Sequence, residues 1–146
     1  MGRGRTDQRR GGSSQDGAMR EAIQHIGGLD SLSEWEARNL VERADGIGRE
    51  LKNKGVTTSQ IRNFLDEVNR IEAENRRSKG SFDESQVVFL DIQLAYAAGR
   101  EDKLKDFARL FSTAIKQVRS REDFDRFVKF TQAVVAYHRF HGGSNR

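Results

Sequence analysis

Residues 87–100 read VVFLDIQLAYAAGR and form the most apolar stretch of an otherwise polar sequence. Up to Ala98, Asp91 and Gln93 are its only strongly polar members, and apolar side chains fall on every side of a helical wheel. A helix that is apolar nearly all round is one that other helices cover. The stretch therefore predicts the central helix of a small bundle, ended by Gly99 because glycine tolerates left-handed backbone geometry.

On both sides of this stretch, apolar residues recur at the spacing of amphipathic helices. The spacing predicts helices over about 19–26, 34–54, 60–76, 101–119 and 121–141. No segment alternates between apolar and polar residues for long enough to predict a strand. We therefore expect an all-α fold, a single small bundle of about five to six helices.

Polar residues at the expected helix ends predict caps and ion pairs. Ser33 with Glu36 has the spacing of a capping box, the residues 57–60 offer a second cap, and Ser120 with Asp123 offers a third. Two pairs of opposite charge have the i, i+4 spacing that stabilises a helix. They are Asp66 with Arg70 and Glu72 with Arg76.

The composition limits the class of protein. The 146 residues amount to one domain, with 35% hydrophobic and 33% charged residues and neither cysteine nor proline. The lack of cysteine excludes a disulfide framework and a thiolate metal site and fits a reducing compartment. No apolar run is long enough to span a bilayer, so we expect a cytoplasmic protein with no membrane partner.

Residues 1–16 differ from the rest. They are rich in glycine and arginine and hold no apolar residue after Met1, so we expect a disordered tail before one domain over 17–146. The first 20 residues carry most of the net charge of +4. The tail could contact phosphates without sequence specificity or could serve only solubility.

Two groups of cations on the body could bind phosphate. Lys105, Arg109, Lys116 and Arg119, with Ser112 between them, fall on one stripe of the helix expected over 101–119. Lys52, Lys54 and Arg62 bracket the turn between two helices, where free amides also favour phosphate. Such contacts supply affinity without sequence discrimination. The alternatives are a solvated helix face and ordinary compensation of helix-end charge.

Catalytic and metal sites find little support. His138 and His141 have ligand-like spacing, but no third ligand is apparent and His138 falls within the apolar arc of its helix. No nucleophile has a neighbouring base and orienting group, and no glycine-rich loop follows a strand. We expect no catalytic residue, no metal and no cofactor. Tyr137 is the aromatic residue best placed to touch a nucleotide or partner, with edge packing as the alternative.

Three motifs occur in order: TTSQIR (57–62), LAYAAGR (94–100) and AVVAYHR (133–139). Together they resemble the small subunit of type III-A CRISPR effector complexes, the Csm family. The likeness covers roughly residues 51–143. One departure is Thr131-Gln132, where the family often has an acidic residue, so no role is given to a carboxylate there.

The resemblance implies a non-catalytic helical bundle of antiviral interference that stacks head to tail with copies of itself. Beside it would lie the backbone subunits that hold the guide RNA and cleave the target. Such a subunit would contact the guide–target duplex through its backbone, since base pairing supplies the sequence information. The motifs would place Arg62, Arg100, Tyr137, His138 and Arg139 at RNA or subunit contacts.

Two functions therefore remain open. The first is an RNA-binding structural subunit whose partners are guide and target RNA, other subunits of the complex and copies of itself. The second is a helical adaptor that binds only protein. The sequence does not set the copy number.

Overall fold

A computed structural model describes residues 17–78 and 80–144 of the chain. The expected tail over 1–16 lies outside the described residues. The described part is helical and contains no strand. Its helices are α2 (Ala18–Gly27), α3 (Ala37–Asn53), α4 (Thr58–Ser78), α5 (Ser85–Val88), α6 (Leu90–Arg100), α7 (Lys105–Ile115) and α8 (Arg121–Phe140), with short 3₁₀ helices η1 (Leu32–Glu34) and η2 (Asp102–Leu104). The all-α prediction is confirmed.

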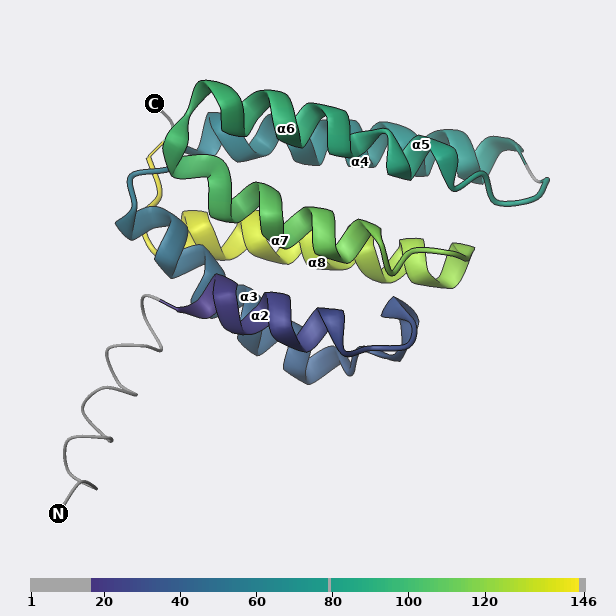
Figure 1. Ribbon diagram of the computed structural model, residues 1–146, viewed down its shortest axis with the longest axis horizontal. Helices are drawn as coiled ribbons and strands as arrows, with labels where there is room; N and C mark the ends of the chain where they lie inside the picture. Colours follow the sequence, from purple (N-terminus) through teal and green to yellow (C-terminus); the bar gives the residue numbers. More distant parts are fainter. Residues whose placement is uncertain (1–16, 79, 145–146) are drawn as a thin grey trace, which may run out of the picture.

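The helices form two layers (Figure 1). One layer holds α6, α7 and α2 side by side, and the other holds α4, α8 and α3. Apart from α5 and α6, which run in the same direction, helices that follow one another in the chain run in opposite directions. As a result, α2, α4 and α7 begin at the end of the bundle where α3, α6 and α8 finish. The middle members of the two layers are α7 and α8.

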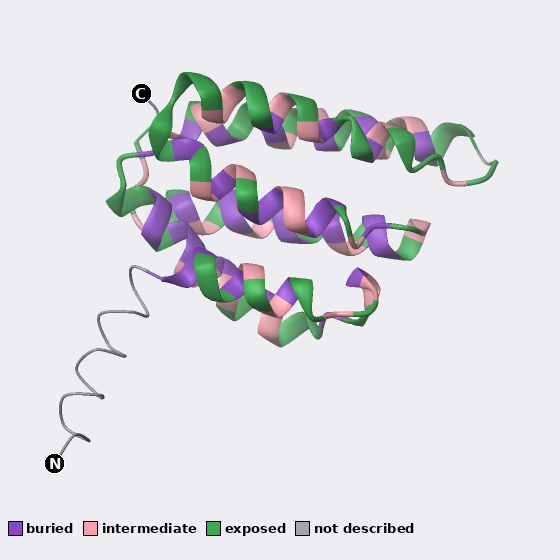
Figure 2. Ribbon diagram, in the orientation of Figure 1, coloured by how far each residue is buried: buried purple, intermediate pink, exposed green. Residues whose placement is uncertain are grey.

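Phenylalanine side chains hold these two middle helices together. Phe111 of α7 lies between Phe127 and Phe130 of α8, at centroid distances of 6.0 and 5.1 Å. Trp35 belongs to the same cluster: its ring centroid lies 4.7 Å from that of Phe130, and the residue is fully buried. Aromatic pairs at these distances add stability beyond the apolar area that they bury. Buried residues recur along the whole length of α7 and α8, as the purple ribbon in Figure 2 shows.

The prediction that residues 87–98 form the central helix is wrong. The segment folds as α5 and α6 on the outside of the bundle, and among the residues of α6 only Leu90 and Leu94 are buried. Phe89, Ile92 and Tyr96 are exposed. An apolar surface all round a helix is compatible with a central helix and equally with an outer helix whose second face is unpartnered.

The expected helix ends are partly confirmed. Thr57 and Gln60 form a reciprocal capping box, and Ser120 accepts from the Asp123 amide. Gly55, with a φ of 81°, lies just beyond the end of α3. Gly99 does not end its helix, because α6 continues to Arg100.

Two further local predictions fail. The capping box of Ser33 with Glu36 is not formed: α3 begins at Ala37, and the Ser33 amide donates instead to Asp123. The ion pair of Glu72 with Arg76 is present at 3.0 Å, but Arg70 pairs with Glu67 and Glu74 in place of Asp66. In the described part of the chain, no helix is long and apolar enough to cross a membrane.

Candidate nucleic-acid interface

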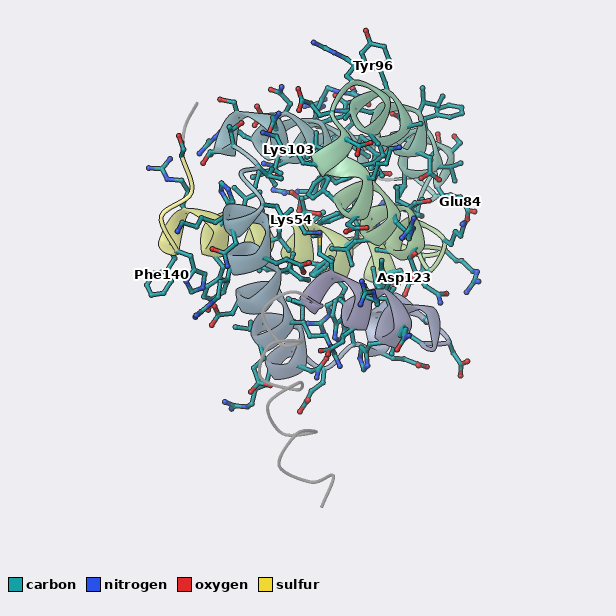
Figure 3. All side chains as sticks on the ribbon, turned by 60° about the vertical axis from the view of Figure 1, so that its left-hand side comes forward. Lys54, Glu84, Tyr96, Lys103, Asp123 and Phe140 are labelled. Atoms are coloured by element: carbon teal, nitrogen blue, oxygen red, sulfur yellow. The ribbon has the colours of Figure 1, made fainter. Side chains whose placement is uncertain are left out.

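One end of the bundle gathers most of the cations that the sequence pointed to. At this end α3 and α6 finish and α4 and α7 begin, so that Lys52, Arg100 and Lys105 come from different helices to the same end (Figure 1). Figure 3 looks toward this side, and both Lys54 and Lys103 are visible on it. The alternation of helix direction produces this gathering from residues that are far apart in the sequence.

The Asp106 carboxylate contacts two of the cations at this end. It accepts from Lys54 at 2.7 Å and lies 3.6 Å from Arg109. Burial opposes the charge of Lys54, but the hydrogen bonds and charges of Asp106 and Glu50 together outweigh it, so the pKa of Lys54 is raised. The hydrogen bond from Lys54 lowers the pKa of Asp106. Each member of the Lys54–Asp106 pair therefore stabilises the charged form of the other.

Lys54 also pairs with a second carboxylate, that of Glu50. The Glu50 carboxylate lies 3.4 Å from the Lys54 ammonium, and Glu50 is buried. Glu50 accepts in addition from the Met19 amide at 2.8 Å, which fastens the start of α2 to α3. Lys54 is thus a structural residue, and a phosphate would have to compete with two carboxylates for it.

Two further cations lie at this end that the sequence did not predict there. Arg20, on α2, shares a small pocket with Asp106 and Arg109. Lys103, in η2, donates to the carbonyl of Gly55 at 2.9 Å. Both come near the others only through packing between distant segments, a signal that spacing along one helix does not contain.

The predicted stripe of α7 is correct over most of its length. Lys105, Arg109 and Lys116 are exposed at i, i+4 and i+11 of the helix, and Lys116 still has helical backbone angles. Lys105 lies 3.0 Å from Asp102 in an exposed pair. We name Lys105, Arg109 and Lys116 the α7 surface.

Arg119 does not belong to this stripe. The helix ends at Ile115, and Arg119 lies in the following turn, where its guanidinium donates to the carbonyl of Asp30 at 3.1 Å. Its backbone amide donates to Asp123. The residue fastens the α7–α8 connection to the loop before η1.

The three predicted residues at the end of α8 differ in exposure. His138 is fully buried; Nε2 lies 2.7 Å from the carbonyl oxygen of Val56. Its side chain presents no surface to RNA in this structure, because it is part of the core. Tyr137 is half-buried against Phe140, which matches the expected edge packing, while Arg139 is exposed.

Arg62 and Arg100 are exposed on α4 and α6. The guanidinium of Arg100 lies 5.8 Å above the ring of Tyr96, a cation–π contact that directs it along α6. A polar groove between the two helices is lined by Gln60, Asn63 and Arg100, among others. Arg62 has no contact with the cations around Asp106 among the interactions found in the described residues.

Metal-binding geometry is not found in the described residues. In the ranges 17–78 and 80–144, no group of three or more histidine or carboxylate side chains could hold an ion. His141 pairs with Asp45, and burial lowers the pKa of His138 more than its bond to Val56 raises it. His138 is thus a core histidine, as the apolar arc of its helix indicated.

Comparison with known proteins decides the family. Residues 34–144 match the family described as Csm2 Type III-A, which is more than half of the chain. The chain belongs to the Csm2 family of type III-A CRISPR systems. The protein named CRISPR system Cms protein Csm2 from Streptococcus thermophilus is 38% identical over 117 residues, which cover 73% of this chain and 94% of that protein. The Csm2 match includes the whole α7 surface and begins after α2, so Arg20 lies outside it.

Proposed function

We propose that this Csm2 family member is a non-catalytic small subunit of a type III-A ribonucleoprotein that binds the phosphate backbone of guide and target RNA. It would act in the cytoplasm, in contact with other subunits of the complex and with copies of itself. The α7 surface is the observation that best supports the proposed RNA contact. Its three cations follow one face of a helix, and no acidic residue occurs in the sequence between Asp106 and Arg121.

The geometry of the α7 surface suits a phosphate backbone. Successive i, i+4 positions on a helix lie about 6 Å apart along its axis, so the cations form a row and not a point. The pairs Lys105–Asp102 and Arg109–Asp106 are exposed, and exposed ion pairs contribute at most about 1 kcal/mol. Phosphates can therefore displace these carboxylates at little cost.

The surface supports binding that does not depend on sequence. Flexible lysine and arginine side chains on a convex helix reach phosphates, whereas base recognition needs a groove or platform that fixes bases. The aromatic residues Phe107, Phe111 and Phe127 are all buried, so they cannot stack on bases. A subunit that serves every guide would need this kind of contact.

Titration with single-stranded RNA tests the proposal. We expect the combined change of Lys105, Arg109 and Lys116 to alanine to weaken binding by about tenfold or more at low salt. The slope of log affinity against log salt should fall by about 2, since each lost phosphate contact on a single strand removes about 0.7. Fluorescence anisotropy at several salt concentrations measures both quantities.

A matched control removes the same charge elsewhere. Arg76, Arg77 and Lys129 are exposed cations outside the α7 surface, and their combined change to alanine should leave the affinity within about threefold of the wild-type value. Equal losses in both variants would mean that net charge, and not the α7 surface, determines binding. Unchanged melting of both variants excludes unfolding as the cause.

The alternative function, an adaptor that binds only protein, makes the opposite prediction. The wild-type chain and the α7 variant would then bind RNA equally weakly, alone and in the assembled complex. The assembled complex is the stronger test, because several aligned copies raise the affinity through effective concentration. Loss of RNA protection by a complex that still assembles with the α7 variant supports the RNA contact.

A further inference from the structure

A groove lies between α4 and α6, close to the end of the bundle where α6 finishes. It consists of two hollows of about 270 and 250 Å³. The hollows have five lining residues in common, which makes them one continuous groove. These residues are Gln60, Asn63, Ala97, Arg100 and Leu104. We name it the α4–α6 groove, and it is separate from the row of cations on α7.

The floor of the α4–α6 groove is apolar. Phe64, Leu94 and Leu104 line it and are buried. Phe107 also lines it and meets Phe64 edge to face, with 5.7 Å between the ring centroids. A floor of this kind offers van der Waals contact to a flat ring and asks for no hydrogen bond from it. It suits the face of an aromatic heterocycle.

Three carboxamides surround this floor: Gln60, Asn63 and Gln93. The Gln60 oxygen accepts from the Thr57 amide, which leaves its amino group as a donor. Within residues 17–78 and 80–144, the side chains of Asn63 and Gln93 have no hydrogen-bond partner. A carboxamide donates and accepts, so it can pair with the polar edge of any nucleobase. The rim therefore favours a base without selecting one.

Tyr96 and Arg100 lie at the outer edge of the α4–α6 groove. Tyr96 is 69% exposed, and Figure 3 shows it projecting away from the bundle. The Arg100 guanidinium lies 5.8 Å from the centre of the Tyr96 ring. Aromatic rings and guanidinium planes are the groups on which proteins stack unpaired RNA bases.

The charges beside the groove suit a ligand with phosphates on one side. Leu104 of the floor lies in the sequence between Lys103 and Lys105, which are both exposed. The Glu101 carboxylate also lines the groove. It repels phosphate but can accept from the amino groups of adenine, cytosine and guanine. A nucleotide is therefore best accommodated with its base in the groove and its phosphates toward the lysines.

We propose that the α4–α6 groove binds one unpaired base of a single-stranded RNA segment, with the neighbouring phosphates on Lys103 and Lys105. The identity of the polymer rests on the proposed function, but the contact is a different one, since it is made to a base and by α4 and α6. The bases of a duplex are stacked and paired and cannot enter the groove. The groove thus distinguishes single-stranded from double-stranded RNA and does not read sequence.

Two strands of equal charge test the proposal. One is a short oligouridylate, and the other is an abasic sugar–phosphate strand of the same length. We expect the wild-type chain to bind the oligouridylate about fivefold or more tightly than the abasic strand, because one stacked base contributes at least that factor. Tyr96→Ala and Asn63→Leu should each remove most of this preference and leave the affinity for the abasic strand unchanged.

Two further variants serve as controls. Phe140 is 76% exposed and lies elsewhere on the molecule, so Phe140→Ala should keep the preference for bases. The α7 variant should bind both strands more weakly by the same factor and should also keep the preference, because it loses phosphate contacts only. The absolute affinity therefore reports on the α7 surface, and the ratio between the two strands reports on the α4–α6 groove.

A competition experiment distinguishes an RNA strand from a free nucleotide. Uridine monophosphate should displace the oligouridylate only at concentrations about tenfold or more above those at which unlabelled oligouridylate does so, because it lacks the neighbouring phosphates. Equal potency of the two competitors would make the groove a site for free nucleotides and would overturn the proposal.

Photo-cross-linking locates the base directly. A strand that contains 4-thiouridine should cross-link to the peptides that hold Asn63 or Tyr96 and not to the peptide that holds Phe140. Equal affinity of the wild-type chain for the two strands overturns the proposal, even where the α7 variant confirms the phosphate contact. A preference that survives both Tyr96→Ala and Asn63→Leu also overturns it. Failure to bind either strand contradicts this proposal and the proposed function together.

Discussion

Gly48 of α3 lies directly against the backbone of His138 in α8. A Cβ placed on Gly48 would lie 2.6 Å from the His138 nitrogen and 2.6 Å from the Tyr137 carbonyl carbon. Cβ atoms do not approach backbone that closely, so only glycine permits the two helices to cross at this distance. The crossing fixes the end of α8 against α3, where His138 meets Val56.

We expect Gly48→Ala to destabilise the fold by about 2 kcal/mol, as overpacking against rigid backbone does. The loss should exceed the gain of about 1 kcal/mol that alanine offers over glycine inside a helix. The free energy of unfolding from urea denaturation measures the difference.

Gly99→Ala is the matched control. No heavy atom lies within 4 Å of the Cβ position at Gly99, and the residue is helical. The same substitution should therefore stabilise the protein, by up to about 1 kcal/mol. If Gly48→Ala were as stable as the wild type, the close crossing of α3 and α8 would be wrong.

The amphipathic helices could be predicted from the sequence because each has one apolar face and one polar face. Apolar spacing placed α2, α4 and α8 within a few residues of their observed bounds. The pattern failed for α5 and α6, since periodicity shows that both sides of a helix are apolar but not what covers each side. Exposure of Ile92 and Tyr96 depends on the position of the helix in the bundle.

The candidate interface was predictable where it lies on one helix and unpredictable where it crosses helices. Lys105, Arg109 and Lys116 keep their spacing on α7. Arg119 left the stripe because α7 ends at Ile115 without a glycine or proline to mark the end. Arg20 joins Arg109 only through the packing of α2 on α7.

The carboxylate of Asp123 joins three segments of the chain, and we expect its loss to be costly. It accepts from the amides of Ser33 and Arg119 at 2.8 and 3.0 Å and from the Ser31 hydroxyl. Asp123 is 2% exposed. Asp123→Ala should destabilise the fold by about 3 kcal/mol, because several buried donors lose their acceptor together. Chemical denaturation at pH 7 measures this loss.

The contribution of Asp123 should disappear in acid. Burial opposes the charge, but the hydrogen bonds from Ser31, Arg119 and Ser33 outweigh it, so the pKa is below the ordinary 3.8. A lowered carboxyl pKa stabilises the fold above the unfolded-state value, and this stabilisation is lost as the pH falls through the folded-state value. The gap between wild type and Asp123→Asn should shrink below about pH 4. A gap independent of pH would contradict the role of the charge.

The capping box at the start of α4 should be worth about 1 kcal/mol. The Thr57 hydroxyl accepts from the Gln60 amide at 3.2 Å, and the Gln60 side chain accepts from the Thr57 amide at 2.9 Å. We expect Thr57→Ala to lower the free energy of unfolding by that amount and Thr57→Ser to preserve it. A double-mutant cycle with Gln60→Ala measures the coupling, and additive effects would mean that the two bonds do not support each other.

His138 should make the fold sensitive to pH below neutrality. Burial lowers its pKa below 6.5, and the neutral ring donates through Nε2 to Val56, which leaves Nδ1 as an acceptor 3.4 Å from the Thr58 hydroxyl. The folded state therefore binds this proton less readily than the unfolded state. Stability should be complete above about pH 6.5 and should fall as the pH drops below that value toward the folded-state pKa.

Histidine-to-glutamine variants distinguish the sources of this pH dependence. A glutamine amide can also donate to Val56 but does not titrate, so His138→Gln should reduce the slope of unfolding free energy against pH between 7 and 5. His25 has a pKa lowered by burial and by Arg43, so it contributes a slope of the same sign. His25→Gln should remove a further part of the slope, and the larger reduction should come from His138, whose side chain is fully buried. An unchanged slope in His138→Gln would show that the ring is not the buried neutral group described above.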